Sequence, residues 1–380
     1  MRLSTSRLTL SFAASVLVLS GCTAVRQAVD MPTATMATGP IPPALTPMAV
    51  RPIGPPPAWA PDIDPQMQAV VEQLMSYEQP PLDAVTPFQA RNEKSATNAV
   101  NDLVIKSGMP PMRPMVDIAH RVLPVGPPDG LLVRMYTPLA PARGPRPVVV
   151  YYHGGGWVIA DLETYEAGAM ALAAQTGAIV VSVAYRLAPE NKFPAQHEDA
   201  FAAYQWVTQN AAQIGGDPAR IATAGESAGG NLAVAVAMMA RERGVALPVH
   251  ILSVYPIADG DTQSPSYDQY ANAAPLSRAG MAWFFGHTLA RPADAQNPMI
   301  SLVGADLSGM PPTTIVNAQI DVLTSDGEEL AAALTRAGVG VERRVFPGVT
   351  HEFFGMAAVL NQSAEAQAYA AGRLRAAFGM

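Results

Sequence analysis

The chain has 380 residues, of which 14% are charged and 49% are hydrophobic, and its formal net charge is −7. A chain of this length and composition can bury a large core, which excludes a disordered tail. The negative net charge disfavours a polyanionic partner, so nucleic acid is not expected to bind.

The N-terminus has the pattern of an export signal. A basic stretch, 1–7, precedes an apolar run from Leu8 to Leu19 that is too short to span a bilayer. The run ends in Leu19-Ser20-Gly21-Cys22, which holds the only cysteine of the chain. This ending resembles the lipobox of bacterial lipoproteins, in which a signal peptide (here 1–21) is removed and the cysteine (here Cys22) is acylated. An ordinary cleaved signal with a chance cysteine is the alternative.

The segment after the cysteine is predicted to be a lipidated, proline-rich tether, residues 22–65. Residues 31–65 carry eleven of the 36 prolines, and such a segment forms neither helix nor sheet. Thr23 stands where an inner-membrane retention signal would have aspartate. The lipoprotein resemblance therefore implies an outer-membrane anchor, with the folded part in the periplasm or at the cell surface.

Beyond the tether, residues 66–113 show helical periodicity and are predicted to form a helical cap region. Residues 114–380 alternate between strand and helix patterns. Strands are expected at 116–122, 131–136, 148–152, 179–184, 221–224, 251–255, 314–317 and 341–346, and helices at 167–175, 199–211, 228–243, 327–337 and 364–376. This alternation predicts an α/β fold with a mostly parallel, eight-stranded sheet covered by helices on both faces. Residues 260–300, aromatic but weakly periodic, are expected to join the cap.

Two glycine-rich motifs follow predicted strands. His153-Gly154-Gly155-Gly156-Trp157 comes directly after an apolar run, and its backbone N–H groups could face an oxyanion. Gly225-Glu226-Ser227-Ala228-Gly229-Gly230 lies between a strand and a helix. A serine on such a turn is held in a strained bend with its hydroxyl exposed. The two motifs together predict an acyl-transfer enzyme.

A nucleophilic serine needs a base and an orienting acid. His351 follows the predicted strand 341–346 and a turn-like segment, which places it at the carboxyl edge of the sheet. Asp321 ends another strand, whereas Asp326 and Glu328 begin the next helix, where carboxylates commonly interact with the helix dipole. Asp321 is preferred, since a buried loop carboxylate can hold the imidazole tautomer. The chain order of serine, acid and base is that of α/β-hydrolases.

These motifs resemble the hormone-sensitive lipase family of carboxylic ester hydrolases, the bacterial family IV esterases. Further matching segments are Tyr185-Arg186-Leu187-Ala188-Pro189-Glu190, Phe193-Pro194-Ala195, Asp306-Leu307-Ser308-Gly309-Met310-Pro311-Pro312 and Phe346-Pro347-Gly348-Val349-Thr350-His351. The resemblance implies that Ser227 is the nucleophile, His351 the base and Asp321 the acid. It also implies that Gly154, Gly155 and Ala228 donate to the oxyanion, and that no metal or organic cofactor takes part.

The chain departs from the family pattern at three positions. Glu226 stands where aspartate is commoner, Val322 replaces a proline after the acid, and Glu352 replaces a glycine after the histidine. None of these changes removes a reacting group. The Glu352 carboxylate beside the base is expected to raise the pKa of the histidine.

The expected activity is hydrolysis of short-chain or aromatic acyl esters by a serine carboxylic ester hydrolase. Trp157 adjoins the glycine motif and is expected to line the substrate pocket. A deacetylase of polysaccharides or small molecules would use the same residues with a more open, polar pocket. A binding protein that kept the fold and lost turnover is the remaining alternative.

Overall fold

The computed structural model describes residues 50–108 and 115–380. The predicted signal peptide, Cys22 and most of the predicted tether lie outside these described residues. No helix within the described ranges is long and apolar enough to cross a membrane.

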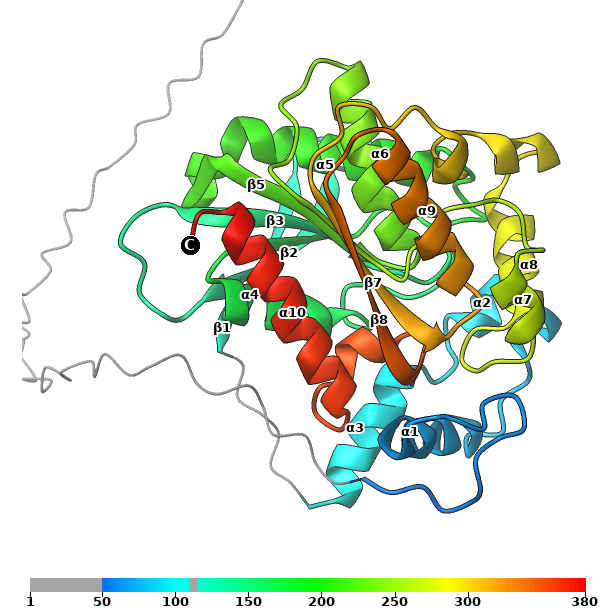
Figure 1. Ribbon diagram of the computed structural model, residues 1–380. Coiled ribbons are helices and arrows are strands. Elements are labelled where there is room, and N and C mark those ends of the chain that lie inside the picture. Colours follow the sequence, from blue (N-terminus) through cyan, green and yellow to red (C-terminus); the bar gives the residue numbers. More distant parts are fainter. Residues whose placement is uncertain (1–49, 109–114) are drawn as a thin grey trace, which may run out of the picture. The chain divides into compact units, whose positions relative to one another are not determined.

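The core of the molecule is a single eight-stranded sheet (Figure 1). Its strands are β1 (Val116–Leu123), β2 (Leu131–Pro138), β3 (Arg146–Tyr152), β4 (Ile179–Val183), β5 (Gly216–Glu226), β6 (Ile251–Val254), β7 (Thr313–Ile320) and β8 (Val341–Thr350). Their order is β1-β2-β4-β3-β5-β6-β7-β8. β1 pairs antiparallel with β2, and β2 pairs antiparallel with β4. All other neighbours in this order pair parallel. The predicted α/β-hydrolase architecture is confirmed.

Helices cover both faces of this sheet, as the strand–helix alternation predicted (Figure 1). They are α4 (Glu166–Thr176), α5 (Ala195–Asn210), α6 (Ala228–Glu242), α9 (Thr324–Arg336) and α10 (Asn361–Ala377), with the 3-10 helices η2 (Ala211–Ile214), η4 (Leu302–Gly304) and η5 (Phe353–Gly355). Val148 and Val150 of β3 face the core under α5, α6 and α9, whereas Val149 and Tyr151 face the core under α4 and α10. A strand buried on both faces requires the uninterrupted apolar run that the sequence has here.

The cap joins two segments that are far apart in the sequence. Its elements are α1 (Pro65–Met75), η1 (Leu82–Ala84), α2 (Pro87–Ala90), α3 (Ala96–Lys106), α7 (Pro265–Gln269), α8 (Arg278–Thr288) and η3 (Pro292–Gln296). The Trp283 indole of α8 donates a 3.0 Å hydrogen bond to the carbonyl of Val85, next to η1. This contact joins the segment 260–300, which the sequence predicts to belong to the cap, to the N-terminal segment.

The end of the predicted tether is folded. Ala60 and Ile63 are buried in the core under α4 and α10, and the amide of Asp64 donates to the carbonyl of Gly348 in β8 at 2.8 Å. The Asp64 carboxylate caps α1 by accepting hydrogen bonds from its first amides. The predicted boundary at residue 65 was therefore too late, because apolar residues among these prolines have a surface to pack on.

The turn predicted before His351 is also different in the structure. β8 continues through Pro347-Gly348-Val349-Thr350 to the residue before the histidine. The pairing of β7 with β8 shifts register near Ala318, and Gly348 has a φ of +71°, so the strand bends instead of ending. The bend keeps Val349 and Thr350 buried.

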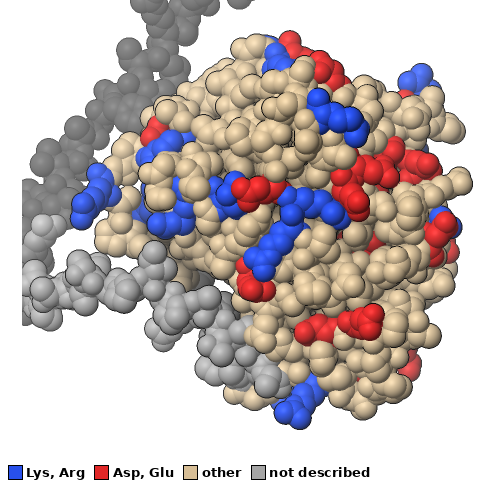
Figure 2. Space-filling model, viewed as in Figure 1, with Lys and Arg blue, Asp and Glu red and all other residues tan. Residues whose placement is uncertain are grey.

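Charged side chains of both signs are interspersed on the face shown in Figure 2, and most of that face is uncharged. Ion pairs join neighbouring elements: Arg344 of β8 lies 3.4 Å from Glu365 of α10, and Arg373 of α10 lies 2.7 Å from Glu342 of β8. Exposed pairs of this kind contribute little to stability. The packing of α10 on the sheet therefore depends mainly on its apolar face.

Candidate active site

Ser227 occupies the turn between β5 and α6. Its φ of 58° and ψ of −118° lie in a region that a non-glycine residue rarely adopts. The bend is held by a 2.8 Å hydrogen bond from the Ser227 amide to the carbonyl of Val254. The Ser227 hydroxyl makes no hydrogen bond to another residue in the described part of the chain. The predicted strained elbow is thus present, and its hydroxyl is uncommitted.

The elbow lies directly against the end of β3. A Cβ atom on Gly229 would collide with the carbonyl oxygens of Tyr152 and His153, so only glycine fits in this first turn of α6. This close approach brings the serine beside the glycine motif, although the two lie about 70 residues apart in the chain.

The glycine motif forms a loop after β3. Gly155 has a φ of +93°, and its carbonyl accepts from the amides of Val158 and Ile159 at 3.0 and 2.9 Å. The amides of Gly154, Gly155 and Ala228 find no acceptor among the described residues. Three unsatisfied N–H groups on two touching segments could receive a developing oxyanion.

His153 is buried at the base of this loop. Its Nδ1 lies 2.8 Å from the carbonyl oxygen of Gly154, and the Tyr185 hydroxyl donates to the His153 carbonyl at 2.7 Å. Burial lowers the pKa of His153 to about 4, so the ring is neutral at physiological pH. These contacts hold the His153 ring against the glycine loop, so its role is structural.

Asp321 and His351 form a buried pair. His351 Nδ1 lies 2.7 Å from Asp321 Oδ2, and the other carboxylate oxygen accepts from the amide of Leu323 at 3.0 Å. Asp326, the rival acid, instead accepts hydrogen bonds from the amides of Ala258 and Asp259. The structure therefore brings together the acid and base that the sequence preferred.

The serine and the histidine of the expected triad are not hydrogen-bonded to each other. No hydrogen bond joins the Ser227 hydroxyl to the His351 ring, whose Nε2 is also uncommitted among the described residues. Both residues adjoin Tyr255, which follows β6: its ring centroid lies 4.6 Å from that of His351, and the preceding residue, Val254, accepts from the Ser227 amide. Catalytic hydrogen bonds are often loose before substrate binds.

The surroundings of His351 set its charge. Burial lowers the pKa of His351, but the charge and hydrogen bond of Asp321, with the carboxylates of Glu352 and Glu226, raise it above its usual value. The direction expected from the Glu352 substitution is confirmed. A negative environment of this kind stabilises an imidazolium that forms during a reaction.

The expectation for Trp157 is corrected. Its side chain is completely buried, and its ring packs 5.9 Å from that of His197 and 6.4 Å from that of Phe285. Trp157 has a φ of 62°, which turns the indole into the core beneath the loop. The side chain exposes no surface and does not line a substrate pocket in this structure.

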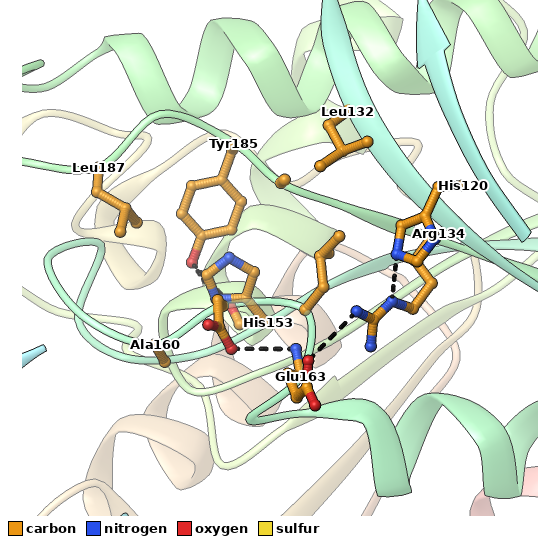
Figure 3. Close-up of a pocket in the computed structure, with 11 residues that line it drawn as sticks. His120, Leu132, Arg134, His153, Ala160, Glu163, Tyr185 and Leu187 are labelled. Atoms are coloured by element: carbon orange, nitrogen blue, oxygen red, sulfur yellow. Dashed lines mark hydrogen bonds and ion pairs between the residues drawn. The ribbon is translucent and has the colours of Figure 1, made fainter. Parts of the chain in front are cut away.

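A cavity of about 270 Å³ lies on another side of the glycine loop (Figure 3). Its lining residues include His153 and Tyr185 on one side and Arg134 and His120 on the other. Arg134 is committed to neighbours, since its Nε donates to His120 at 2.9 Å and its Nη1 to Glu166 at 2.9 Å. None of Ser227, Asp321 and His351 lines this cavity, so it is separate from the expected triad.

Three tyrosines around the base were missed by sequence reasoning. Tyr151, Tyr165 and Tyr255 are buried, and their hydroxyls donate to the carboxylates of Glu226 and Glu352. In the sequence they look like ordinary core aromatics, and only the two unusual glutamates gave a signal. Within the described ranges, no group of histidine, cysteine or carboxylate side chains is arranged to hold a metal ion.

Comparison with known proteins shows the family of the chain. Residues 149–355 match the model of a family described by the alpha/beta hydrolase fold. This range includes both glycine-rich motifs and all three expected triad residues.

Individual relatives agree with the family match. The carboxylesterase NlhH of Mycobacterium tuberculosis is 43% identical over 251 residues, which cover 63% of this chain and 76% of that protein. The ethyl acetate hydrolase of Pseudomonas putida is 35% identical over 62% of this chain and 75% of that protein. The solved structure of a hyperthermophilic esterase from Pyrobaculum calidifontis superposes with a TM-score of 0.73 at 35% identity, over 83% of this chain and 98% of the other.

Proposed function

We propose that this chain cleaves short-chain or aromatic acyl esters with Ser227, His351 and Asp321. The chain belongs to the α/β-hydrolase family and is a serine carboxylic ester hydrolase of the hormone-sensitive lipase type. The observation that supports this assignment most is the 2.7 Å contact between His351 and Asp321 at the edge of the sheet that also carries Ser227. A relative named for ethyl acetate supports the short-chain part of the proposal.

The reaction proceeds through an acyl-enzyme. His351 Nε2 removes the proton of the Ser227 hydroxyl as Oγ attacks the ester carbonyl carbon. The amides of Gly154, Gly155 and Ala228 donate to the oxyanion, and loss of one such donor typically costs about 3 kcal/mol of barrier. His351 then gives its proton to the leaving alcohol. Water repeats the sequence on the acyl-enzyme and releases the acid.

Asp321 has two tasks in this scheme. Its contact with Nδ1 fixes the tautomer in which Nε2 is free to accept the serine proton. Its negative charge stabilises the imidazolium that forms after the transfer. The strained backbone at Ser227 holds the hydroxyl in place, so little reorganisation is needed when substrate binds.

The test is a chain-length series. Hydrolysis of p-nitrophenyl acetate through decanoate is measured with the wild type and with Ser227→Ala, whose circular dichroism confirms folding. We expect release to depend on Ser227 and to be fastest with the short esters. Absence of Ser227-dependent release on every ester would overturn the proposal. A strict acetate preference, together with deacetylation of acetylated xylan, would favour the deacetylase instead.

We further propose that the enzyme is an exported envelope lipoprotein anchored through Cys22, with the outer membrane as its location. The support is the lipobox-like ending Leu19-Ser20-Gly21-Cys22 after a short apolar run. Cys22→Ser is expected to move the protein from the membrane fraction to the soluble fraction and to abolish labelling by a fatty-acid probe. Unchanged membrane association and labelling would reject the anchor.

A further inference from the structure

Five buried or partly buried side chains form two neighbouring hydrogen-bonded groups beside His351, which together we call the glutamate–tyrosine cluster. Its members come from five separate parts of the fold: Tyr151, Tyr165, Glu226, Tyr255 and Glu352. Asp321 and His351 adjoin this cluster. No lysine or arginine within the described residues pairs with any member, so the carboxylates have only tyrosine hydroxyls and the His351 ring to stabilise their charge.

Glu226 is held by two tyrosines. The hydroxyl of Tyr151 donates to its Oε1 and that of Tyr255 to its Oε2. Gly168 of α4 leaves room for this carboxylate, because a Cβ at that position would collide with Oε1. Burial raises the pKa of Glu226 to about 8, although both tyrosine hydrogen bonds oppose the shift.

Glu352, which follows His351, is hydrogen-bonded to a tyrosine that lies beside the glycine loop. Its Oε1 accepts a hydrogen bond from the Tyr165 hydroxyl. The same hydroxyl fills the space beside Gly154, where a Cβ would collide with it. Glu352 has a φ of +70°, a conformation that glycine adopts without strain, so the backbone alone does not explain a glutamate here.

We propose that Glu352, acting through Tyr165, is a positioning residue. It holds His351 at a fixed position relative to the glycine loop, whose amides would bind the oxyanion. The inference rests on the proposed esterase function. The residue following the base and the residue at the start of α4 are 187 positions apart, and their hydrogen bond spans the two halves of the reacting centre. The bridge keeps the imidazole and the Gly154 amide at a constant separation while the oxyanion forms.

The charge on Glu352 has a second, separable effect. A nearby carboxylate favours the imidazolium, so it contributes to the raised pKa of His351. The groups facing the ring are Asp321 from the end of β7, Glu226 from β5, Tyr255 from the segment after β6 and Glu352 itself. Since the neutral ring is the base, removal of one negative charge moves the acidic limb of the pH profile to lower pH.

Three variants separate the bridge from the charge. Glu352→Gln keeps an acceptor for Tyr165 and removes the charge, Tyr165→Phe removes the bridge and keeps the carboxylate, and Glu352→Gly removes both. We expect kcat on p-nitrophenyl acetate to fall about ten- to hundredfold in Tyr165→Phe and Glu352→Gly. We expect Glu352→Gln to keep kcat within about threefold and to shift the acidic limb of kcat/KM to lower pH.

A double-variant cycle and a distant control complete the test. The Tyr165→Phe/Glu352→Gly protein is expected to lose no more activity than either single variant, because both remove one bridge. Glu365→Gln on α10 removes an exposed charge and is expected to leave kcat and the pH profile unchanged. Melting temperatures of all variants verify folding, and if Glu352→Gly does not fold, the other two variants still decide.

The outcomes distinguish this inference from the proposed function. If the wild type hydrolyses esters through Ser227 but Tyr165→Phe keeps wild-type kcat, the bridge has no positioning role. Additive losses in the double variant would overturn it as well. If Ser227→Ala retains the wild-type rate, the proposed function itself is wrong.

Discussion

The carboxyl edge of the parallel strands and the cap differ in how their side chains are held. At the edge, Asp321 is 1% exposed and His351 4% exposed, and the Asp321 carboxylate is bonded to His351 Nδ1 and to the amide of Leu323. On the cap, Met75, Phe88 and Ile105 are each more than 60% exposed. The proposed reaction therefore uses buried, hydrogen-bonded side chains at the edge, whereas these side chains of the cap lie at the surface.

Specific contacts join the two regions. Phe284 of α8 fills the space beside Gly156, and the Thr288 hydroxyl donates to the Gly156 carbonyl at 3.0 Å. Arg91, which follows α2, reaches the carbonyls of Val158 and Ala188. The cap therefore rests on the glycine loop, so its position can affect the substrate site and the oxyanion donors together.

The largest expected effect tests the buried edge. Asp321→Asn is expected to lower kcat about ten-thousandfold while the fold remains intact, because the amide favours the wrong imidazole tautomer. Steady-state kinetics and circular dichroism measure the two quantities. Asp326→Asn is the matched control and is expected to reduce stability more than kcat, since Asp326 binds the amides of Ala258 and Asp259. A larger loss of kcat in the control would reverse the assignment of the acid.

Two helical glycines test how tightly the edge is packed. Gly229→Ala is expected to cost about 3 kcal/mol or more of unfolding free energy, because its Cβ would meet backbone oxygens that cannot rotate away. Gly372→Ala on α10 has open space and is expected to gain roughly 0.5–1 kcal/mol. Urea denaturation measures both. If Gly229→Ala lowers the free energy of unfolding no more than Gly372→Ala does, the elbow can move away from β3 to make room for the Cβ atom.

A smaller effect is expected where the cap meets the glycine loop. The Arg91 guanidinium donates to Val158 at 2.8 Å, to Ala188 at 2.6 Å and to Glu190 at 2.7 Å. Arg91→Ala is expected to cost about 1.5–3 kcal/mol in urea denaturation, since charged hydrogen bonds to two carbonyls are lost. Glu190→Gln should cost less than about 1 kcal/mol, because that carboxylate is 59% exposed and screened. If the two variants lower the free energy of unfolding by the same amount, the ion pair with Glu190, and not the hydrogen bonds to the two carbonyls, attaches Arg91 to the glycine loop.

A further expected effect concerns pH and stability. The pKa of Glu226 rises from 4.5 to about 8 on folding, so the folded protein binds more protons than the unfolded chain between these values. Stability therefore falls as pH rises through this window. Glu226→Gln is expected to flatten the fall of the melting temperature from pH 5 to pH 8, relative to Glu365→Gln. An unchanged slope would mean that Glu226 is already ionised at low pH.

Local patterns predicted the elements and the motifs well. The strand 148–152 was predicted because five consecutive apolar or aromatic residues are needed where a strand is covered on both faces. The strand at 341–346 was predicted to end too early, because proline and glycine usually end strands. In the structure the proline and glycine lie inside β8, because the pairing of β7 with β8 shifts register beside them.

Side-chain direction was less predictable than position. Trp157 lies beside the glycine motif in the sequence, but its left-handed backbone turns the ring into the core. Glu226 and Glu352 were recognised as unusual, yet nothing in the sequence linked them to Tyr151, Tyr165 and Tyr255. Those partners come from β3, from the residue before α4 and from the residue after β6, and their neighbours depend on the order of the sheet.

The amino-acid sequence by itself determined the fold class and the serine elbow, because strand, glycine turn and helix are specified by residues next to one another. It also narrowed the acid to three carboxylates. Only the tertiary structure shows which of them contacts His351, because β7 lies beside β8 and so brings Asp321 against the ring. The glutamate–tyrosine cluster beside that pair is likewise a product of the tertiary structure, since its hydrogen bonds join residues up to 187 positions apart.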